Sequence, residues 1–364
     1  MKVGIVTMHR VDNYGAVLQA YATCESIRFL GGTPEIIDYI PNRFRLSQQL
    51  LNVRADRAKT ILHKALFIVA SAPIRLKIWR SFSSFIEQTI PLSKKKYYNV
   101  KSMENQDTYD VYLTGSDQVW NSDFDHYIDP VFYLEFAPVG AKKVAYAASF
   151  GKKKLSEDEI PIISGYLRNY NRITVRESEG VDILHSLDLE GDQVLDPTLL
   201  LCKEQWQNVM SKRLVSNKYL LIYQLNPNPE FEKQAKTIAK SKGLKIVKLG
   251  RDIKKAKYVD YQFSFCSPKD FLSLFKYADY VLTDSFHGTA FSINFERNFT
   301  VIYPPRFSGR LKSILELTGQ EERTNIDNHN INVDYSVVTS IIKRERQKSL
   351  DALNSMISLE GDNE

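Results

Sequence analysis

Short apolar runs alternate with amphipathic stretches over most of the chain. Strands are predicted where β-branched and aromatic residues cluster before a polar turn; they cover 1–8, 35–39, 111–114, 143–148, 172–175, 193–195, 219–224, 244–249, 280–282 and 300–303. Helices are predicted where apolar residues recur every three or four positions; they cover 17–30, 158–168, 181–187, 204–214, 229–242, 267–277, 309–317 and 335–357. Strands that alternate with helices predict an α/β fold with parallel sheets.

The chain length predicts more than one hydrophobic core. The chain has 364 residues, more than a single core usually covers. We expect two Rossmann-like domains that face a central cleft, an N-terminal one over 1–217 and a C-terminal one over 218–334. A last helix and tail follow at 335–364, and their packing back on the first domain is a hypothesis. The first strand–helix–strand unit lacks a G-x-G-x-x-G sequence, so a dinucleotide is not expected.

The segment 42–101 interrupts the alternation and is strongly basic. It contains thirteen Lys or Arg residues against Asp56 and Glu87, a net charge of +11 in a chain whose total is +6. Its apolar positions share one helical face, which Arg75, Lys77 and Arg80 avoid. The residues of that face are Ile74, Ile78, Trp79, Phe82, Phe85 and Ile86.

Two interpretations of this segment stay open. A basic amphipathic helix can rest on an anionic membrane surface, which would be a peripheral contact. Alternatively, a helical insertion packs on its own domain and keeps its basic face in water. Because the positive charge is confined to 42–101, nucleic-acid binding is not expected.

The remaining composition predicts a protein of a reducing compartment. Three cysteines stand far apart, with neither metal-site spacing nor a disulfide framework, which favours a cytoplasmic location. The longest apolar run, 65–72, is too short to span a bilayer, and the N-terminus lacks the features of a signal peptide. Asp123-Phe124-Asp125 resembles the D-x-D metal site of many glycosyltransferases, but so short a pattern predicts nothing, and no metal is expected.

The stretch 280–295, YVLTDSFHGTAFSINF, reads as a strand, a tight loop and a helix. Ligands of open α/β sheets bind at such loops, and the start of a helix offers free N–H groups to an anion. His287 lies at this junction, where a proton donor or acceptor would be useful. The alternative is that His287 only caps the helix.

Other polar loops at strand ends add candidate chemistry. Arg176 and Arg310 lie near a strand end and a helix start, where arginine can bind carboxylate or phosphate with two hydrogen bonds. Asp117, Gln118, Trp120 and Asn121 combine hydrogen-bonding groups with an aromatic ring, as sugar sites do. The plain alternatives are surface arginines and a tryptophan of the core.

Six segments of these loops occur together in a recognisable order. They are NYGAVLQAYA at 13–22, GSDQVWN at 115–121, TVRE at 174–177, DP at 196–197, SFHG at 285–288 and GR at 309–310. Taken together they resemble the polysaccharide pyruvyl transferase family. The resemblance covers most of the chain, and it does not identify the sugar.

The resemblance implies a fold similar to that of GT-B glycosyltransferases. It also implies phosphoenolpyruvate as donor, with the second domain as the donor side. The acceptor would be a sugar of a cell-surface polysaccharide or of its lipid-linked precursor, on the first domain. The product would be a pyruvate ketal that bridges two hydroxyls, with phosphate released. No cofactor besides this co-substrate is implied, and a lipid-linked acceptor would bring the enzyme to the inner face of the cytoplasmic membrane.

Residue roles follow from the resemblance and from the chemistry of the side chains. The expected catalytic residues are His287 and Asp117. The expected donor-binding residues are Arg176, Arg310, Ser285, Gly288 and Thr289. The expected acceptor-binding residues are Asn13, Tyr14, Ser116, Gln118, Trp120 and Asn121. Two alternatives remain, a GT-B-type glycosyltransferase that uses a nucleotide sugar and a sugar-binding module without catalysis.

Overall fold

Two parallel β-sheets organise the chain in this computed structural model, which describes residues 1–51, 60–103, 106–124, 126–252, 254–304, 309–324 and 329–358. The first sheet has seven strands in the order β3-β2-β1-β4-β5-β6-β7. Its strands are β1 (Lys2–Val6), β2 (Thr33–Tyr39), β3 (Leu92–Tyr97), β4 (Val111–Thr114), β5 (Lys142–Ala148), β6 (Arg172–Val175) and β7 (Asp192–Gln193).

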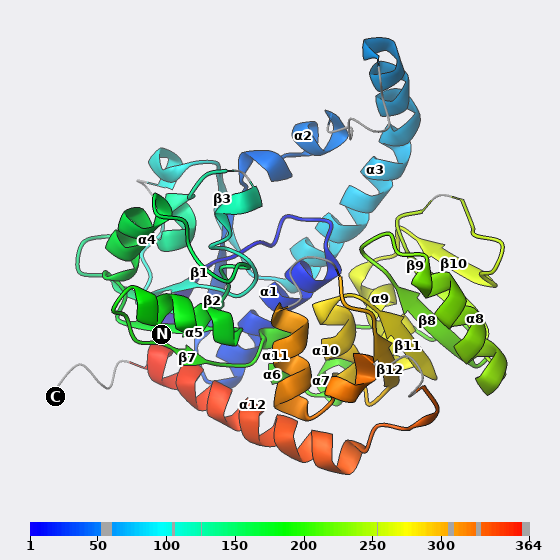
Figure 1. Ribbon diagram of the computed structural model, residues 1–364. Coiled ribbons are helices and arrows are strands. Elements are labelled where there is room, and N and C mark those ends of the chain that lie inside the picture. Colours follow the sequence, from blue (N-terminus) through cyan, green and yellow to red (C-terminus); the bar gives the residue numbers. More distant parts are fainter. Residues whose placement is uncertain are drawn as a thin grey trace.

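The second sheet has five strands in the order β10-β9-β8-β11-β12. They are β8 (Tyr219–Tyr223), β9 (Lys245–Gly250), β10 (Tyr261–Ser264), β11 (Tyr280–Thr283) and β12 (Asn298–Val301). All pairings in both sheets are parallel. The predicted α/β fold with two Rossmann-like units is therefore confirmed (Figure 1).

Helices connect the strands and cover the faces of the sheets (Figure 1). They are α1 (Tyr14–Phe29), α2 (Leu46–Leu51), α3 (Ile61–Thr89), α4 (Glu159–Leu167), α5 (Ser178–Ser186), α6 (Pro197–Leu200), α7 (Lys203–Gln207), α8 (Glu230–Lys242), α9 (Pro268–Lys276), α10 (Phe286–Asn294), α11 (Gly309–Thr318) and α12 (Tyr335–Ile357). Two of them begin at capping residues that matter below. Asn13 accepts hydrogen bonds from the first turn of α1, and Ser285 accepts one from the backbone N–H of Gly288 in α10.

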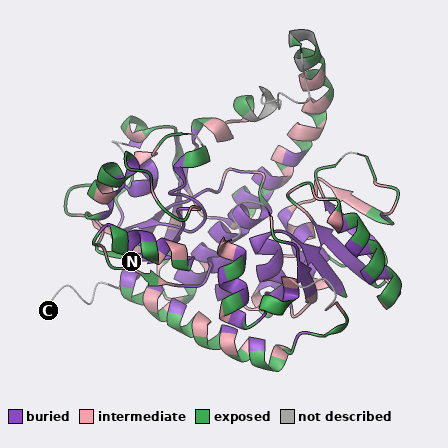
Figure 2. Cartoon of the chain, in the orientation of Figure 1, coloured by how far each residue is buried: buried purple, intermediate pink, exposed green. Residues whose placement is uncertain are grey.

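The two units share one apolar core. Side chains of β1, such as Val3, belong to the same buried cluster as Val281 of β11. Between them, Tyr14 of α1 stacks on Phe271 of α9 with ring centroids 4.6 Å apart, and its hydroxyl donates to the carbonyl of Cys266. Figure 2 shows this buried region as continuous through the middle of the molecule. A shared apolar core favours a fixed arrangement of the two sheets.

Helix α12 lies against both units (Figure 1). At its start the hydroxyl of Tyr335 donates to the carbonyl of Arg297, next to β12. Farther along, Ser349 accepts a hydrogen bond from the backbone of Leu195, and Lys142 of β5 donates to the carbonyl of Ser358 just beyond the helix.

The segment 42–101 needs a correction. Sequence analysis treated the whole segment as an interruption of the sheet. Its residues Leu92–Tyr97 instead form the edge strand β3, which pairs with β2. Three exposed lysines at 94–96 conceal this strand in the sequence, and charged edges of this kind protect a sheet from further pairing. Strand β10 was also not predicted, and the helix expected over 204–214 ends at Gln207.

The two ends of α3 differ in their packing. From Ile78 onward, its predicted apolar face is buried against the core. The earlier half projects from the molecule, with Leu66 and Val69 exposed (Figures 1 and 2). The basic residues at 54, 57 and 59 lie outside the described residues. No helix of the described chain combines the length and apolar character that crossing a membrane requires.

Candidate functional site

A cleft of about 450 Å³ lies where loops of the two units meet. The first unit contributes the loops after β1 and β4, and the second contributes the start of α10 and of α11. The side chains of the cleft are Met8, Val11, Asp12, Asn13, Ala16, Arg43, Phe44, Asp117, Gln118, Phe124, Leu225, Asn226, Arg251, Asp284, Ser285, Phe286, His287, Pro304, Arg310 and Leu311. Both predicted catalytic residues are among them.

His287 lies in the first turn of α10 and is nearly buried, with 6% of its surface exposed. Its Nε2 atom is 3.8 Å from Oδ2 of Asp196 and has no hydrogen-bond partner in the described structure. The imidazole ring also lies against Gly15, where any side chain would collide with the ring. The imidazole is thus held between two helix starts, with one nitrogen near a carboxylate.

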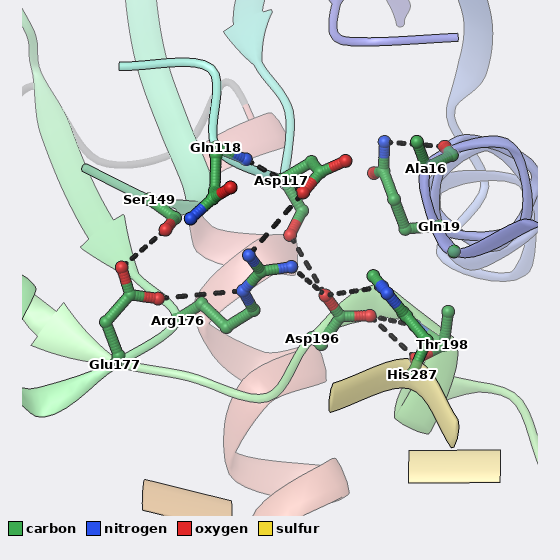
Figure 3. A network of polar contacts seen from close by, with 12 residues as sticks. Ala16, Gln19, Asp117, Gln118, Ser149, Arg176, Glu177, Asp196, Thr198 and His287 are labelled. Atoms are coloured by element: carbon green, nitrogen blue, oxygen red, sulfur yellow. Dashed lines mark hydrogen bonds and ion pairs between the residues drawn. The ribbon is translucent and has the colours of Figure 1, made fainter. Parts of the chain in front are cut away.

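Asp196 joins His287 to the first unit (Figure 3). One carboxylate oxygen caps α6 by accepting from the backbone N–H and the hydroxyl of Thr198. The other accepts from Ser116 and, at 2.8 Å, from Arg176. Burial by itself would raise the pKa of Asp196, but His287 and the charge of Arg176 hold it well below its usual range. Asp196 is therefore a fixed negative charge beside His287.

Arg176 is the centre of a cluster of carboxylates (Figure 3). Besides Asp196, its guanidinium nitrogens lie 3.6 Å from Asp117 and 3.6 Å from Glu177, and it covers the ring of Phe286. Burial would lower the pKa of Arg176, but these carboxylates raise it above its ordinary value. Sequence analysis predicted a donor anchor at this position. In the structure the guanidinium of Arg176 is instead paired with neighbouring carboxylates. Such pairing suits a residue that positions other side chains.

Arg310 differs from Arg176 in this respect. It is the second residue of α11 and lines both the cleft and a smaller cavity of about 130 Å³ behind it. Among the described residues it forms neither a hydrogen bond nor an ion pair. Burial, and then repulsion by Arg176, lower its pKa below the ordinary value. Its hydrogen-bonding groups are therefore free to receive an anion.

Asp117 adopts a left-handed backbone conformation, with φ of 79°. Such values are uncommon outside glycine and often occur at functional loops. Its side chain accepts a hydrogen bond from the backbone of Gln118 and lines the cleft together with that residue. The loop after β4 is thus held so that a carboxylate borders the cleft.

Four of the other predicted residues lie in or at the cleft, or directly behind it. Asn13 and Ser285 line it as helix caps. Ser116 is fully buried behind it and donates to Asp196. Gly288 packs against Thr283, whose hydroxyl leaves no room for a side chain at that position.

The structure corrects the expected roles of Trp120 and Tyr14. Trp120 is 1% exposed, stacks on Tyr133 and donates its indole N–H to the carbonyl of Phe132, so it is a core residue. Tyr14 is turned into the contact with α9 described above. Thr289 is also fully buried and donates to the carbonyl of Ser285. Asn121 is buried and accepts a hydrogen bond from the backbone of Asp123. None of the four lines the cleft.

Several residues at or beside the cleft were missed by sequence analysis. Asp196, which lines the smaller cavity, was noted only as part of a D-P turn, although Asp before Pro at a helix start signals a cap. Arg43 and Phe44 were hidden in the basic segment. Arg251 follows β9 and pairs with Asp12 across the two units at 3.3 Å, a contact that no local pattern announces.

The described residues hold no group of three His, Cys, Asp or Glu side chains that could bind a metal ion. Of the D-x-D pattern, Asp125 lies outside the described residues.

Comparison with known protein families gives one match over most of the chain. Residues 13–305 match the family described as polysaccharide pyruvyl transferase. No curated protein matches the chain.

Similar solved structures span nearly the whole chain at low identity. They include UDP-GlcNAc 2-epimerase from Methanocaldococcus jannaschii in complex with UDP-GlcNAc and UDP, at 11% identity and a TM-score of 0.49, with 98% of this chain and 99% of that chain covered. The epimerase from Neisseria meningitidis has 11% identity, a TM-score of 0.45 and coverage of 96% and 100%. Spinosyn forosaminyltransferase SpnP has 8% identity, a TM-score of 0.47 and coverage of 98% and 99%.

Proposed function

Because the chain belongs to the polysaccharide pyruvyl transferase family, we propose that it transfers pyruvate from phosphoenolpyruvate to a sugar. The sugar belongs to a cell-surface polysaccharide or to its lipid-linked precursor. The observation that carries the proposal is the pairing of a free arginine, Arg310, with a histidine at a helix start in one cleft. Phosphoenolpyruvate is a small trianion, so its site needs a cation that binds it and a group that donates a proton to C3.

The reaction balances without a further reactant. Two hydroxyls of one sugar form two C–O bonds to C2 of phosphoenolpyruvate, and the C2–O bond to phosphate breaks. Of the two protons that the hydroxyls lose, the balance places one on C3, which becomes a methyl group, and the other on the released phosphate. The protein must therefore deliver a proton to C3, hold the carboxylate and phosphate, and accept protons from the hydroxyls.

Donor binding falls to Arg310 and the start of α10. The hydroxyl of Ser285 already satisfies the N–H of Gly288, which leaves the N–H groups of Phe286 and His287 for an anion. Arg310 supplies the charge-assisted hydrogen bonds. Arg176 contributes by fixing Asp196 and Asp117, consistent with its contacts in Figure 3.

Proton transfer falls to His287. Its Nε2 lies near Asp196, and a fixed carboxylate stabilises the imidazolium that donates to C3. Asp117 borders the same cleft from the acceptor side and accepts a proton from an attacking hydroxyl. General acid–base help of this kind is worth about 10²–10⁴-fold in rate.

Thermal unfolding with added ligand tests the donor. Phosphoenolpyruvate at a hundred times its dissociation constant should stabilise the wild type by about 2.7 kcal/mol. Arg310→Gln should lose this stabilisation, and Arg344→Gln, on an exposed face of α12, should keep it. Stabilisation by UDP-glucose and not by phosphoenolpyruvate would favour the glycosyltransferase alternative and contradict the proposal.

Catalysis needs a separate measurement. His287→Gln should bind phosphoenolpyruvate and fold normally, yet release phosphate at least 100-fold more slowly in the presence of polysaccharide precursors extracted from the host. Near-normal release would remove His287 from the mechanism.

The protein acts at the cytoplasmic face of the membrane in this proposal, with the exposed side of α3 as its contact. Leu66 and Val69 are exposed on the projecting half of this helix, and Lys77 and Arg80 are exposed farther along it. The stretch 60–86 contains no acidic residue. An apolar and basic surface matches anionic lipid.

Sedimentation with vesicles of phosphatidylcholine and phosphatidylglycerol tests this contact. Lys77→Glu/Arg80→Glu should sediment less than the wild type. The matched pair Lys233→Glu/Lys236→Glu on α8 should sediment like the wild type, because α8 lies in the second unit and both lysines are exposed. Equal sedimentation of all three proteins, or none, would remove the membrane contact.

A further inference from the structure

One wall of the cleft is aromatic, and none of the predicted site residues forms it. Phe44 ends the short helix η1 (Asn42–Phe44), and Phe124 ends the short helix η4 (Ser122–Phe124). Both line the cleft that holds His287 and Arg310. The guanidinium of Arg43 lies 4.5 Å from the centre of the Phe44 ring and 5.2 Å from that of Phe124. One arginine thus connects the two rings into a single wall.

Phe124 is 48% exposed and is not part of the aromatic-rich core of the first unit. Four residues earlier in the same loop, Trp120 is packed fully into that core. An exposed aromatic ring forgoes the hydrophobic free energy that its burial would give. An exposed ring that lines a cleft is suited to pack against a ligand bound in that cleft.

The chemistry around the ring fits a pyranose. The C–H face of a sugar ring is apolar and slightly positive, and it stacks on the negative face of an aromatic ring. Polar groups at the rim can bind the hydroxyls: Asp12 from the first unit, and Asn226 and Arg251 from the second. Arg43 fixes the platform through cation–π contacts.

We propose that Phe124, supported by Phe44 and Arg43, is the platform on which the acceptor pyranose stacks. The inference rests on the proposed function, because it specifies the acceptor half of the same cleft. It replaces Trp120, the aromatic residue that the sequence suggested for this purpose. Phe124 thereby sets where the sugar hydroxyls stand relative to His287 and Asp117.

Saturation-transfer NMR on the full-length protein tests the platform, with methyl β-D-glucopyranoside and methyl β-D-galactopyranoside as probes. The wild type should transfer magnetisation to the ring C–H protons of at least one probe. Phe124→Ala should raise the apparent dissociation constant about tenfold, and Phe124→Trp should restore binding. Phe29→Ala, which removes an even more exposed ring at the far end of α1, should bind like the wild type.

Donor binding separates failure of this inference from failure of the proposed function. Phe124→Ala should keep the full thermal stabilisation by phosphoenolpyruvate. Wild-type sugar affinity in Phe124→Ala, or no binding of either sugar by the wild type, overturns the platform. Loss of the phosphoenolpyruvate effect in Phe124→Ala also overturns it, since the ring would then serve the donor. Absence of that effect in the wild type contradicts the proposed function alone.

Discussion

Gly15 in α1 and His287 in α10 lie so close that a Cβ atom on Gly15 would stand 1.9 Å from Nδ1 of the imidazole. The first turns of α1 and α10, which belong to different units, therefore meet at the imidazole ring of His287. The absence of a side chain at residue 15 is what allows His287 to occupy its place beside Asp196. This contact explains the need for glycine in physical terms, because a methyl group at residue 15 would displace the imidazole of His287.

Gly15→Ala should inactivate the protein without unfolding it. A displacement of about 1 Å at a reacting group can cost about 100-fold in rate. Phosphate release from phosphoenolpyruvate is the measurement, and circular dichroism checks the fold. Gly165→Ala is the matched control, since a Cβ atom there would meet no neighbour within 4 Å. Equal activity of both variants would contradict the contact.

Asp196→Asn should be strongly destabilising. The carboxylate is fully buried between Arg176 and His287, and removing one partner of a buried ion pair costs about 3–5 kcal/mol. Urea unfolding measures this loss. Asp192→Asn provides the comparison, because its side chain is 64% exposed beside Arg172 and such surface pairs are worth less than about 1 kcal/mol. A loss of stability no larger than that of Asp192→Asn would show that the buried ion pair between Asp196 and Arg176 does not stabilise the fold.

The free energy of unfolding should fall steeply below pH 4.5. Burial alone would raise the pKa of Glu159, but hydrogen bonds from Ser122, Ser156 and Lys152 lower it to about 2. The pKa values of Asp38 and Asp196 are held low as well. Since an unfolded glutamate has a pKa of about 4.3, the unfolded chain binds protons first as the pH falls. The stabilisation is therefore complete above about pH 4.5 and is lost toward pH 2.

Melting temperatures between pH 7 and pH 2.5 check this pH dependence. Glu159→Gln should be less stable at pH 7 and should lose less on acidification than the wild type. A wild-type melting temperature that stays constant from pH 5 to pH 3 would contradict the assignment of low pKa values.

Trp120→Ala and Phe124→Ala should have opposite phenotypes. Removing the buried indole should cost about 3–5 kcal/mol of stability, whereas removing the exposed ring of Phe124 should leave the melting temperature nearly unchanged. Guanidinium unfolding measures both. A stable Trp120→Ala variant would place the indole outside the core.

The sequence predicted much of this arrangement because its strongest signals are local. The run YVLT followed by SFHG contains a buried strand, a capping serine and a helix start, and these features require no distant contact. Ordered loop segments then placed His287, Asp117 and Arg310 in one site. All three line the same cleft.

What could not be predicted depends on contacts between distant residues. Arg176 looks like an anion anchor until Asp117 and Asp196 are seen to converge on it from other loops. Trp120 and Phe124 stand in one loop with similar neighbours, and only the packing of the first sheet decides which ring is buried. Strand β3 was missed for a different reason. Its three consecutive lysines interrupt the alternation of apolar and polar residues by which a strand is recognised.

The course of α12 has a consequence for biosynthesis. Its residues Leu353, Met356 and Ile357 complete the same apolar cluster that Val3 and Ile5 begin. The first sheet is translated before the second and therefore stays partly uncovered until α12 has been translated. The first unit can finish folding only once α12 has left the ribosome, and a stop codon ahead of α12 would harm the sheet that was made earlier.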